Sequence, residues 1–432
     1  MSSISTRFPL LVSILALATI AGCDDGSTVS LAGAVTVSAP TVVGAAPIIA
    51  LAPDGARTVA WVSAADGGID GRMYVSTDDR APVEVRDTLG PIEPHGEAPP
   101  KIAYGADGVL HAVYVVGKEV PGRRFPMSAL RYVRSTDHGA SWTTPASVTD
   151  TSVVGSYNFH ALHVGADGTI YVSWLDGRDG KSATYMTRST DGGHSWVANV
   201  RVATGESCPC CRTAMATAGD GTLYLSWRTV LPGNVRDIVI ARSTDRGDTW
   251  TEPVRVHADD WEFDACPHAG PSLQVDDRGR LHVAWWTGKE GRAGVWYSRS
   301  DDGARTFNSP TALGTARFSR PAHVQMVLGN DDLVVAAWDD GTLKTPRVVM
   351  RVSHDGGAHF ADAIAVSDSG AAATFPVLAL ADRNVTVVWA EQSQEAASHA
   401  EHSRPDMNDP NSVMPLPAVG TSQVFLRTGT IR

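Results

Sequence analysis

The chain has 432 residues, of which 43% are apolar and 19% charged, and its 41 glycines and 25 prolines argue against long helices or a coiled coil. Its 36 basic and 47 acidic side chains give a net charge of −11, which disfavours the basic surface that a nucleic-acid-binding protein needs. The 12 tryptophans outnumber both the 9 tyrosines and the 9 phenylalanines, which indicates a structural position that repeats along the chain.

The N-terminal segment has the features of an export signal. One early charge, Arg7, is followed by an apolar run over residues 8–20, which is too short to span a bilayer as a stable helix. The small residues Ala21 and Gly22 directly before Cys23 resemble a bacterial lipobox, in which the cysteine receives a diacylglyceryl group. A plain signal peptide that is cleaved near Ala21 is the alternative.

We therefore predict a lipoprotein signal peptide at residues 1–22, lipidation of Cys23 and a lipid-anchored tether at residues 23–33. The rest of the chain is then expected outside the cytoplasm, where free thiols tend to be oxidised. Its lipid would anchor it to a bacterial membrane, either on the periplasmic side of the inner membrane or at the outer membrane.

The body of the chain repeats a short box. Its strong copies begin at Arg134, Arg188 and Arg242, 54 residues apart, and read Arg-Ser-Thr-Asp-x-Gly-x-(Ser/Thr)-Trp. Weaker copies begin at Ser300 and Ser353, and a degenerate copy begins at Ser76. In such a box the aspartate accepts hydrogen bonds from turn amides, the glycine adopts a positive φ and the tryptophan packs in the next strand. The box therefore predicts a tight hairpin with a structural aspartate, at Asp137, Asp191, Asp245, Asp302 and Asp355.

A second repeated element lies upstream of each box. An Asp-Gly turn leads into a strand of alternating pattern that ends in an aromatic residue. This aromatic recurs seven times, at Trp61, Tyr114, Trp174, Trp227, Trp285, Trp338 and Trp389. The two elements together predict an all-β protein, a β-propeller of seven four-stranded blades with the box hairpins between the third and fourth strands. A six-bladed ring with an accessory strand segment is the alternative.

The seventh unit stops after a third strand near residues 423–428. Residues 34–38 could supply its missing outer strand, so that strands from both ends close the ring and leave no exposed sheet edge. This predicts a single propeller domain over residues 34–432, which we expect to be monomeric.

The boxes in a propeller resemble those of the sialidase (BNR or Asp-box repeat) superfamily, over nearly all of the chain after residue 22. The resemblance implies the fold, whereas members of the superfamily bind glycans, cleave them or do no chemistry. A sialidase implies three arginines around the sialic carboxylate, a tyrosine nucleophile paired with a glutamate, and a catalytic aspartate. The first inner strand, residues 45–51, lacks the expected arginine, and neither residues 123–126 nor residues 318–321 replace it. The residues that could face a ligand in the channel are Tyr157, Arg178, Arg212, Arg228 and Arg320.

Two adjacent blades carry matching cysteine segments. When the blades are aligned on their second-strand aromatic, Cys208-Pro209-Cys210 falls on Cys266-Pro267-His268. Residues 95–97 take the same position in the second unit, and residues 155–157 take it in the third. Because this position precedes the innermost strand, it rings the mouth of the central channel. We expect five side chains to lie together there: Cys208, Cys210, Cys211, Cys266 and His268.

Converging sulfurs and an imidazole suit copper, as Cu(I), or zinc. Four cysteines besides Cys23 in an oxidising compartment also fit structural disulfides, with a Cys208–Cys266 bridge between blades. That bridge would leave two adjacent cysteines, whose disulfide is strained. A redox-active thiol pair is a third interpretation. A disulfide does not need His268, so its presence favours a ligand set.

Three functions fit these patterns. The sequence favours a binding protein for a glycan or a similar ligand at the channel mouth over a catalyst. A metal-binding envelope protein and an exo-sialidase type of glycoside hydrolase are the alternatives. Copper or zinc is the one cofactor that the residues indicate, and no nucleic acid is expected.

Overall fold

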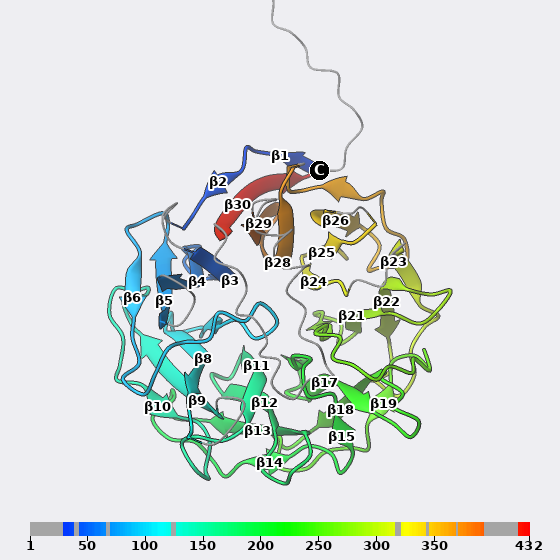
Figure 1. The fold of residues 1–432 in the computed structure, drawn as a ribbon. Coiled ribbons are helices and arrows are strands. Elements are labelled where there is room, and N and C mark those ends of the chain that lie inside the picture. Colours follow the sequence, from blue (N-terminus) through cyan, green and yellow to red (C-terminus); the bar gives the residue numbers. More distant parts are fainter. Residues whose placement is uncertain are drawn as a thin grey trace, which may run out of the picture.

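The computed structural model describes residues 29–38, 43–65, 70–121, 127–315, 321–342, 345–368, 370–392 and 422–432. Their strands form seven antiparallel sheets that are arranged as blades in a ring (Figure 1). This confirms the all-β, seven-bladed propeller, and the six-bladed alternative is wrong. The described residues contain no helix, and thus no helix that is long and apolar enough to cross a membrane. The predicted signal peptide, Cys23 and Arg320 lie outside the described residues.

In blades 1 to 6 the strands follow one another along the chain, with the first strand of the four nearest the centre of the ring (Figure 1). Blade 1 contains β3 (Val43–Leu51), β4 (Arg57–Ala65), β5 (Asp70–Thr77) and β6 (Val83–Val85). Blade 2 contains β7 (Lys101–Tyr104), β8 (Leu110–Lys118), β9 (Met127–Ser135) and β10 (Ala146–Ser147). Blade 3 contains β11 (Tyr157–Val164), β12 (Ile170–Asp176), β13 (Ala183–Ser189) and β14 (Val200–Arg201).

Blade 4 contains β16 (Ala214–Thr217), β17 (Leu223–Val230), β18 (Ile238–Ser243) and β19 (Val254–Arg255), and β15 (Glu206–Ser207) also pairs with β17. Blade 5 contains β20 (Ser272–Val275), β21 (Leu281–Thr287), β22 (Gly294–Ser300) and β23 (Thr311–Thr315). Blade 6 contains β24 (Gln325–Leu328), β25 (Val334–Asp340), β26 (Arg347–Ser353) and β27 (Ile364–Ala365). Blade 7 contains β28 (Ala372–Ala381), β29 (Asn384–Gln392) and β30 (Ser422–Ile431), with β1 (Val29–Leu31) and β2 (Val35–Thr36).

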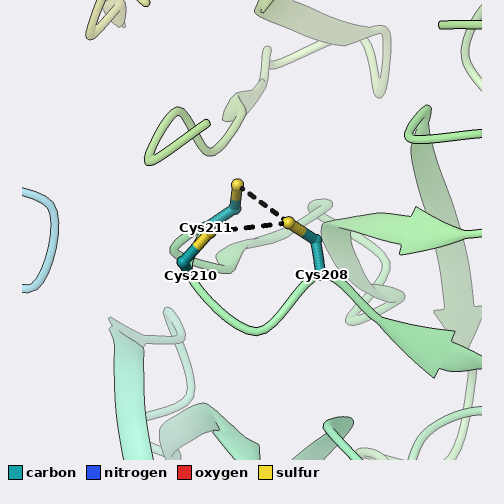
Figure 2. Close-up of side chains that lie close together, drawn as sticks. All are labelled: Cys208, Cys210 and Cys211. Carbon is teal, nitrogen blue, oxygen red and sulfur yellow. Dashed lines mark hydrogen bonds between the residues drawn. The ribbon is translucent and has the colours of Figure 1, made fainter. Parts of the chain in front are cut away.

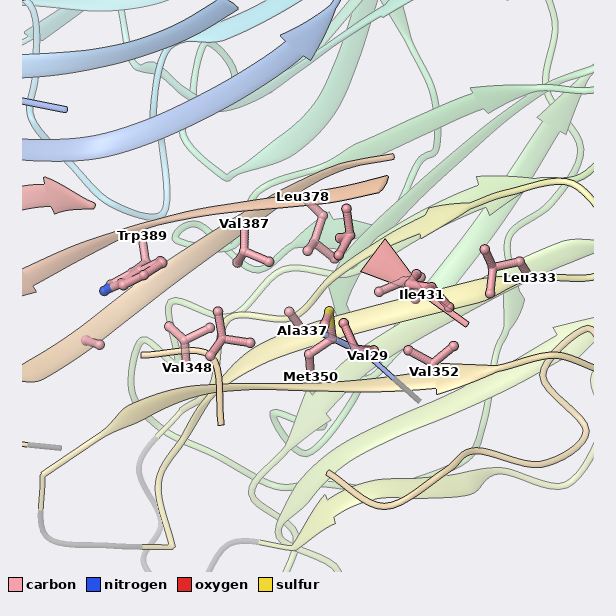
Figure 3. Packing of buried hydrophobic residues seen from close by; sticks show 14 residues of the cluster. Val29, Leu333, Ala337, Val348, Met350, Val352, Leu378, Val387, Trp389 and Ile431 are labelled. Atoms are coloured by element: carbon pink, nitrogen blue, oxygen red, sulfur yellow. The ribbon is translucent and has the colours of Figure 1, made fainter. Parts of the chain in front are cut away.

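The ring is closed by strands from the two ends of the described chain. β1 and β2 both pair with β30, with Val29 opposite Ile431 and Val35 opposite Leu426. Residues 29–31, predicted as part of the tether, are therefore part of blade 7 instead. Burial explains this difference, because Val29 is 5% exposed and packs with Ile431 and Met350 in the core between blades 6 and 7 (Figure 3).

The second strand of each blade is buried on both faces, because a blade packs between two neighbours. β12, for example, is buried at every residue. The seven repeated aromatic residues stand on these second strands and are at most 3% exposed. Trp389, on β29, lies with Val348 and Val387 in the core shown in Figure 3. Half of the 12 tryptophans thus occupy one position that repeats from blade to blade.

The boxes form the hairpins between third and fourth strands. In blade 2 the Asp137 carboxylate accepts hydrogen bonds from the Ser141 amide at 2.8 Å and from the Ser135 hydroxyl at 2.7 Å. The Gly139 amide donates to the Ser135 hydroxyl, and Gly139 has a φ of +83°, which favours glycine. The hydroxyls of Ser141 and Ser135 lower the pKa of Asp137 to about 2, so the carboxylate stays ionised. Corresponding hydrogen bonds surround Asp191, Asp245, Asp302 and Asp355.

Candidate metal centre at the channel mouth

Three sulfurs gather in the loop between β15 and β16 of blade 4. The Sγ atom of Cys208 lies 3.4 Å from that of Cys211 and 3.7 Å from that of Cys210 (Figure 2). The amide of Cys208 donates to the carbonyl of Arg228 on β17, which fixes the start of the loop. All three cysteines are at most 3% exposed, so their sulfurs face the interior of the protein.

A second group of ligand atoms shares one of these sulfurs. Cys210, Cys266 and His268 place their ligand atoms within 4.8 Å of one another, as do Cys208, Cys210 and Cys211. Cys266 and His268 lie before β20 of blade 5, and Cys266 is exposed. The structure therefore brings the five predicted side chains together through Cys210. The four cysteines in the described residues are free thiols, so the structure shows neither the interblade disulfide nor a vicinal one.

His268 has the features of a metal ligand. Its Nδ1 atom is buried and has no hydrogen-bond partner among the described residues. Its backbone has a φ of +49°, which is strained for a residue with a side chain. The ring lies 5.3 Å from that of His95 and 6.1 Å from that of Phe159, measured between centroids. Burial lowers the pKa of His268, and it lowers that of His95 to about 4, so both imidazoles are neutral, as metal ligands must be.

Two arginines stabilise negative charge on the sulfurs. The thiols of Cys210 and Cys211 donate hydrogen bonds to Cys208, and these hold the pKa of the Cys208 thiol far below its usual value. Arg236 also donates from Nη1 to the Cys208 sulfur at 3.1 Å, and the charge of Arg228 acts in the same direction. Among the three sulfurs of this loop, these contacts favour negative charge on Cys208.

An ion pair crosses the channel beside this cluster. The Glu97 carboxylate of blade 2 accepts hydrogen bonds from the Arg212 amide at 3.1 Å, from the Arg212 guanidinium, and from the Gly270 amide at 2.5 Å. The Arg212 guanidinium also donates to the Val324 carbonyl of blade 6 at 3.0 Å. Arg212 comes from blade 4 and Gly270 from blade 5. Glu97 is completely buried, so this pair ties four blades together at their centre.

The other predicted ligand-binding residues that the structure describes form hydrogen bonds and ion pairs away from the cysteine cluster. Tyr157 is 2% exposed, and its hydroxyl contacts the hydroxyls of Thr151 and Ser152. Arg178 forms an ion pair with Asp176 at 2.7 Å. Arg228 donates to three backbone carbonyls, those of Arg236, Ala269 and Trp286. The structure therefore does not assemble a three-arginine site from the described candidates.

His323 is a channel residue that the sequence patterns missed. It precedes β24, and its Nδ1 atom lies 2.6 Å from the Asp339 carboxylate. Burial opposes protonation, but Asp339 raises the pKa of His323 above its ordinary value. A hollow beside it is lined by Lys101, Arg212, His323, Gln325, Pro47, Gly96, Pro99, Phe375, Pro376 and Val377. His323 stands 15 residues before Trp338, as Arg212 stands before Trp227, and this common offset could have identified it.

The family comparison agrees with this architecture. Residues 168–408, more than half of the chain, match the family described as BNR repeat-like domain. The chain belongs to this family of sialidase-like propellers. No curated protein sequence matches the chain.

Solved structures share the fold of this BNR propeller at low sequence identity. A protein of unknown function from Dyadobacter fermentans is 14% identical with a TM-score of 0.57, covering 94% of this chain and 100% of its own. A family PL25 ulvan lyase bound to a GlcA-Rha3S unit is 13% identical with a TM-score of 0.56, covering 83% and 93%. The α-L-arabinofuranosidase Arb93A from Fusarium graminearum is 14% identical with a TM-score of 0.50, covering 76% and 92%. At these identities the likeness establishes the fold alone.

Proposed function

We propose that this BNR propeller binds a thiophilic metal ion at its channel mouth, as a lipid-anchored protein of the bacterial envelope. The observation that carries the proposal is the pair of ligand groups that share Cys210. Soft thiolate ligands with an imidazole select copper, as Cu(I), or zinc over harder ions such as magnesium or calcium. The envelope location rests on the lipobox-like segment that ends at Cys23.

The environment of the cluster supports binding of a metal rather than a disulfide. The buried Nδ1 atom of His268 has no hydrogen-bond partner among the described residues. Burying such an atom is costly, and binding a metal ion through its lone pair would remove this cost. Arg236 and Arg228 offset thiolate charge, which a disulfide would not carry. Ligation needs deprotonated thiols and neutral imidazoles. The pKa of Cys208 lies below its usual value and burial lowers that of His268, whereas the pKa values of Cys210 and Cys211 are raised, so a metal ion has to displace the protons of those two thiols.

Metal analysis tests the proposal. The chain is expressed in a bacterial host, purified without oxygen, loaded with Cu(I) or Zn²⁺, dialysed and analysed for bound metal. We expect the wild type to retain metal, and Cys210→Ser and His268→Ala to retain less while keeping the wild-type urea midpoint. His359→Ala is the matched control, because this exposed histidine contacts Asp355 in a hairpin. A wild type that retains neither ion would overturn the proposal.

The hollow beside His323 supports a second function, binding of an acidic glycan. Of the basic side chains in its lining, Arg212 is paired with Glu97 and His323 with Asp339. Lys101, for which the described residues show no ion pair, is therefore the group that a sugar carboxylate would contact. The ulvan lyase, a structural neighbour, is bound to a GlcA-containing ligand. We expect calorimetry to detect a glucuronate-containing disaccharide but not a neutral one. Lys101→Met should abolish this binding and the exposed-site control Lys181→Met should not; equal binding of both sugars would refute it.

Sialoside hydrolysis is not part of the proposal. Tyr157 is buried with its hydroxyl engaged, and Arg178 and Arg228 are held by their own partners. A fluorogenic sialoside should therefore give no release above background. Hydrolysis that is lost in Tyr157→Phe would contradict this assignment.

A further inference from the structure

The two ligand groups differ in their access to solvent. The inner group, Cys208, Cys210 and Cys211, is fully buried, whereas the outer group ends at the exposed Cys266. Within the described residues, ligand atoms gather in groups of three and in no group of four. Zinc in structural sites takes four ligands in a tetrahedron. A set of three soft ligands suits Cu(I), which is stable with three neighbours and prefers thiolates.

We infer that the site holds two Cu(I) ions, one in each group, bridged by the Cys210 thiolate. The inference rests on the proposed metal-binding function and specifies its ion and its stoichiometry. Cys210 belongs to both groups, and a thiolate sulfur has lone pairs for two metal ions. Three sulfurs around one ion at roughly 2.3 Å lie roughly 4 Å apart in a plane. The Sγ separations of 3.4 and 3.7 Å from Cys208 are shorter than this spacing, so the sulfurs would move apart by up to roughly 0.6 Å to admit an ion.

Charge balance is compatible with two monovalent ions and disfavours two divalent ions. Four thiolates and two Cu(I) ions leave two negative charges, and two arginines are placed to offset them. Arg236 donates to the Cys208 sulfur at 3.1 Å, and the buried Arg228 acts on both Cys208 and Cys211. Two divalent ions would neutralise the thiolates and leave both arginine charges buried without compensation, which is costly. No redox step is involved: each copper enters as Cu(I), and each thiol that binds releases its proton to solvent.

The difference in access predicts an order of loading. Cys266 and His268 lie at the mouth, so the first ion reaches the outer group. Cys210 belongs to both groups, so it can pass an ion inward to Cys208 and Cys211 by exchanging one sulfur at a time. A mutation in the outer group should therefore slow loading of the inner group without removing its ligands.

A Cu(I) titration against a chromogenic chelator tests the inference on the full chain under anaerobic conditions. We expect two ions per chain for the wild type, one each for Cys266→Ser and Cys211→Ser, and none held tightly by Cys210→Ser. His359→Ala should retain two, and near-ultraviolet circular dichroism identifies any variant that is not folded. Copper X-ray absorption supplies a second measurement: a copper–copper signal is expected in the wild type and should be lost in Cys266→Ser.

The outcomes separate this inference from the function on which it rests. One Cu(I) per wild-type chain, or one Zn²⁺ that needs all four cysteines, overturns the two-ion site and leaves the metal-binding function intact. Retention of neither Cu(I) nor Zn²⁺ overturns both. Equal copper content in Cys210→Ser and the wild type overturns the bridging role of Cys210.

Discussion

The central ion pair makes the stability of the ring depend on one side chain. Glu97→Ala removes the acceptor of three hydrogen bonds, two from backbone amides and one from the Arg212 guanidinium. Arg212 is 4% exposed, so its charge would be left in the interior with the Val324 carbonyl as its remaining acceptor. The substitution therefore perturbs blades 2, 4, 5 and 6 at once.

The magnitude follows from the partners that lose their acceptor. Removing one member of a buried ion pair costs about 3–5 kcal/mol, because the other charge is left uncompensated. Each buried amide without an acceptor costs a further 1–3 kcal/mol, roughly, although water that enters the vacated space offsets part of this. We expect Glu97→Ala to lower the free energy of unfolding by about 5–6 kcal/mol, near the lower end of the summed ranges because of that water. Glu97→Gln keeps an acceptor oxygen for the amides and should lose less.

Urea unfolding followed by tryptophan fluorescence measures this loss. The matched control is Glu206→Ala, because Glu206 forms its ion pair with the exposed Lys181 at the surface. Exposed pairs contribute about 0–1 kcal/mol, so the control should unfold close to the wild-type midpoint. If Glu97→Ala destabilised the protein by no more than Glu206→Ala does, the central pair would not tie the blades together as its geometry indicates.

Three further perturbations test individual features. Lys101→Met should stabilise the protein below pH 7 by about 4–5 kcal/mol, because burial lowers the folded pKa of Lys101 to about 7 from about 10.4 when unfolded. The gain should vanish above about pH 10 in urea titrations. Asp137→Asn should lower the urea midpoint at pH 6, and the difference should shrink as the pH falls from about 4 toward the folded pKa of about 2. Val29→Asp should lower the midpoint strongly because it buries a charge where the ring closes.

For each of these substitutions, a control variant or a specific result can contradict the prediction. Val35→Asp is the control for Val29→Asp, since Val35 is 53% exposed on the neighbouring strand; equal effects would show that closure does not depend on β1. A Lys101→Met variant that is less stable than the wild type at pH 6 would show that the ammonium has a compensating partner. A difference for Asp137→Asn that stays constant between pH 6 and pH 2 would show that the charge of the hairpin aspartate is not what stabilises it.

The fold could be predicted because its determinants repeat. The box that starts at Arg134 and the aromatic at Tyr114 encode one blade, and their period counts the blades. The exact start of the ring could not be predicted, because β1 is a three-residue strand whose partner, Ile431, lies at the other end of the chain. A short strand carries too few residues for a periodic pattern, and its pairing is decided by burial in a core that the sequence does not display.

The candidate site was predictable only in part, for a similar reason. Alignment to the blade repeat placed Cys208 and Cys266 at one mouth, because position within a repeat translates into position around the ring. The function of an arginine depends instead on its partners: Arg178 is held by Asp176, and Arg228 by backbone carbonyls. His323 was missed because it has no neighbouring cysteine, and its acidic partner lies 16 residues further along the chain.

The position of the proposed metal site follows from the positions in each blade that the repeated residues do not occupy. Aromatic residues on the second strands and aspartates in the hairpins recur from blade to blade because they form the packing and the turns. Where the chain enters the innermost strand, four blades instead share a positive φ, at Ala46, Phe159, His268 and Phe375. In three of them it coincides with a register shift of the inner strand. The repeat thus fixes the backbone at the channel mouth but not the side chain, so chemistry can change there while the ring stays intact.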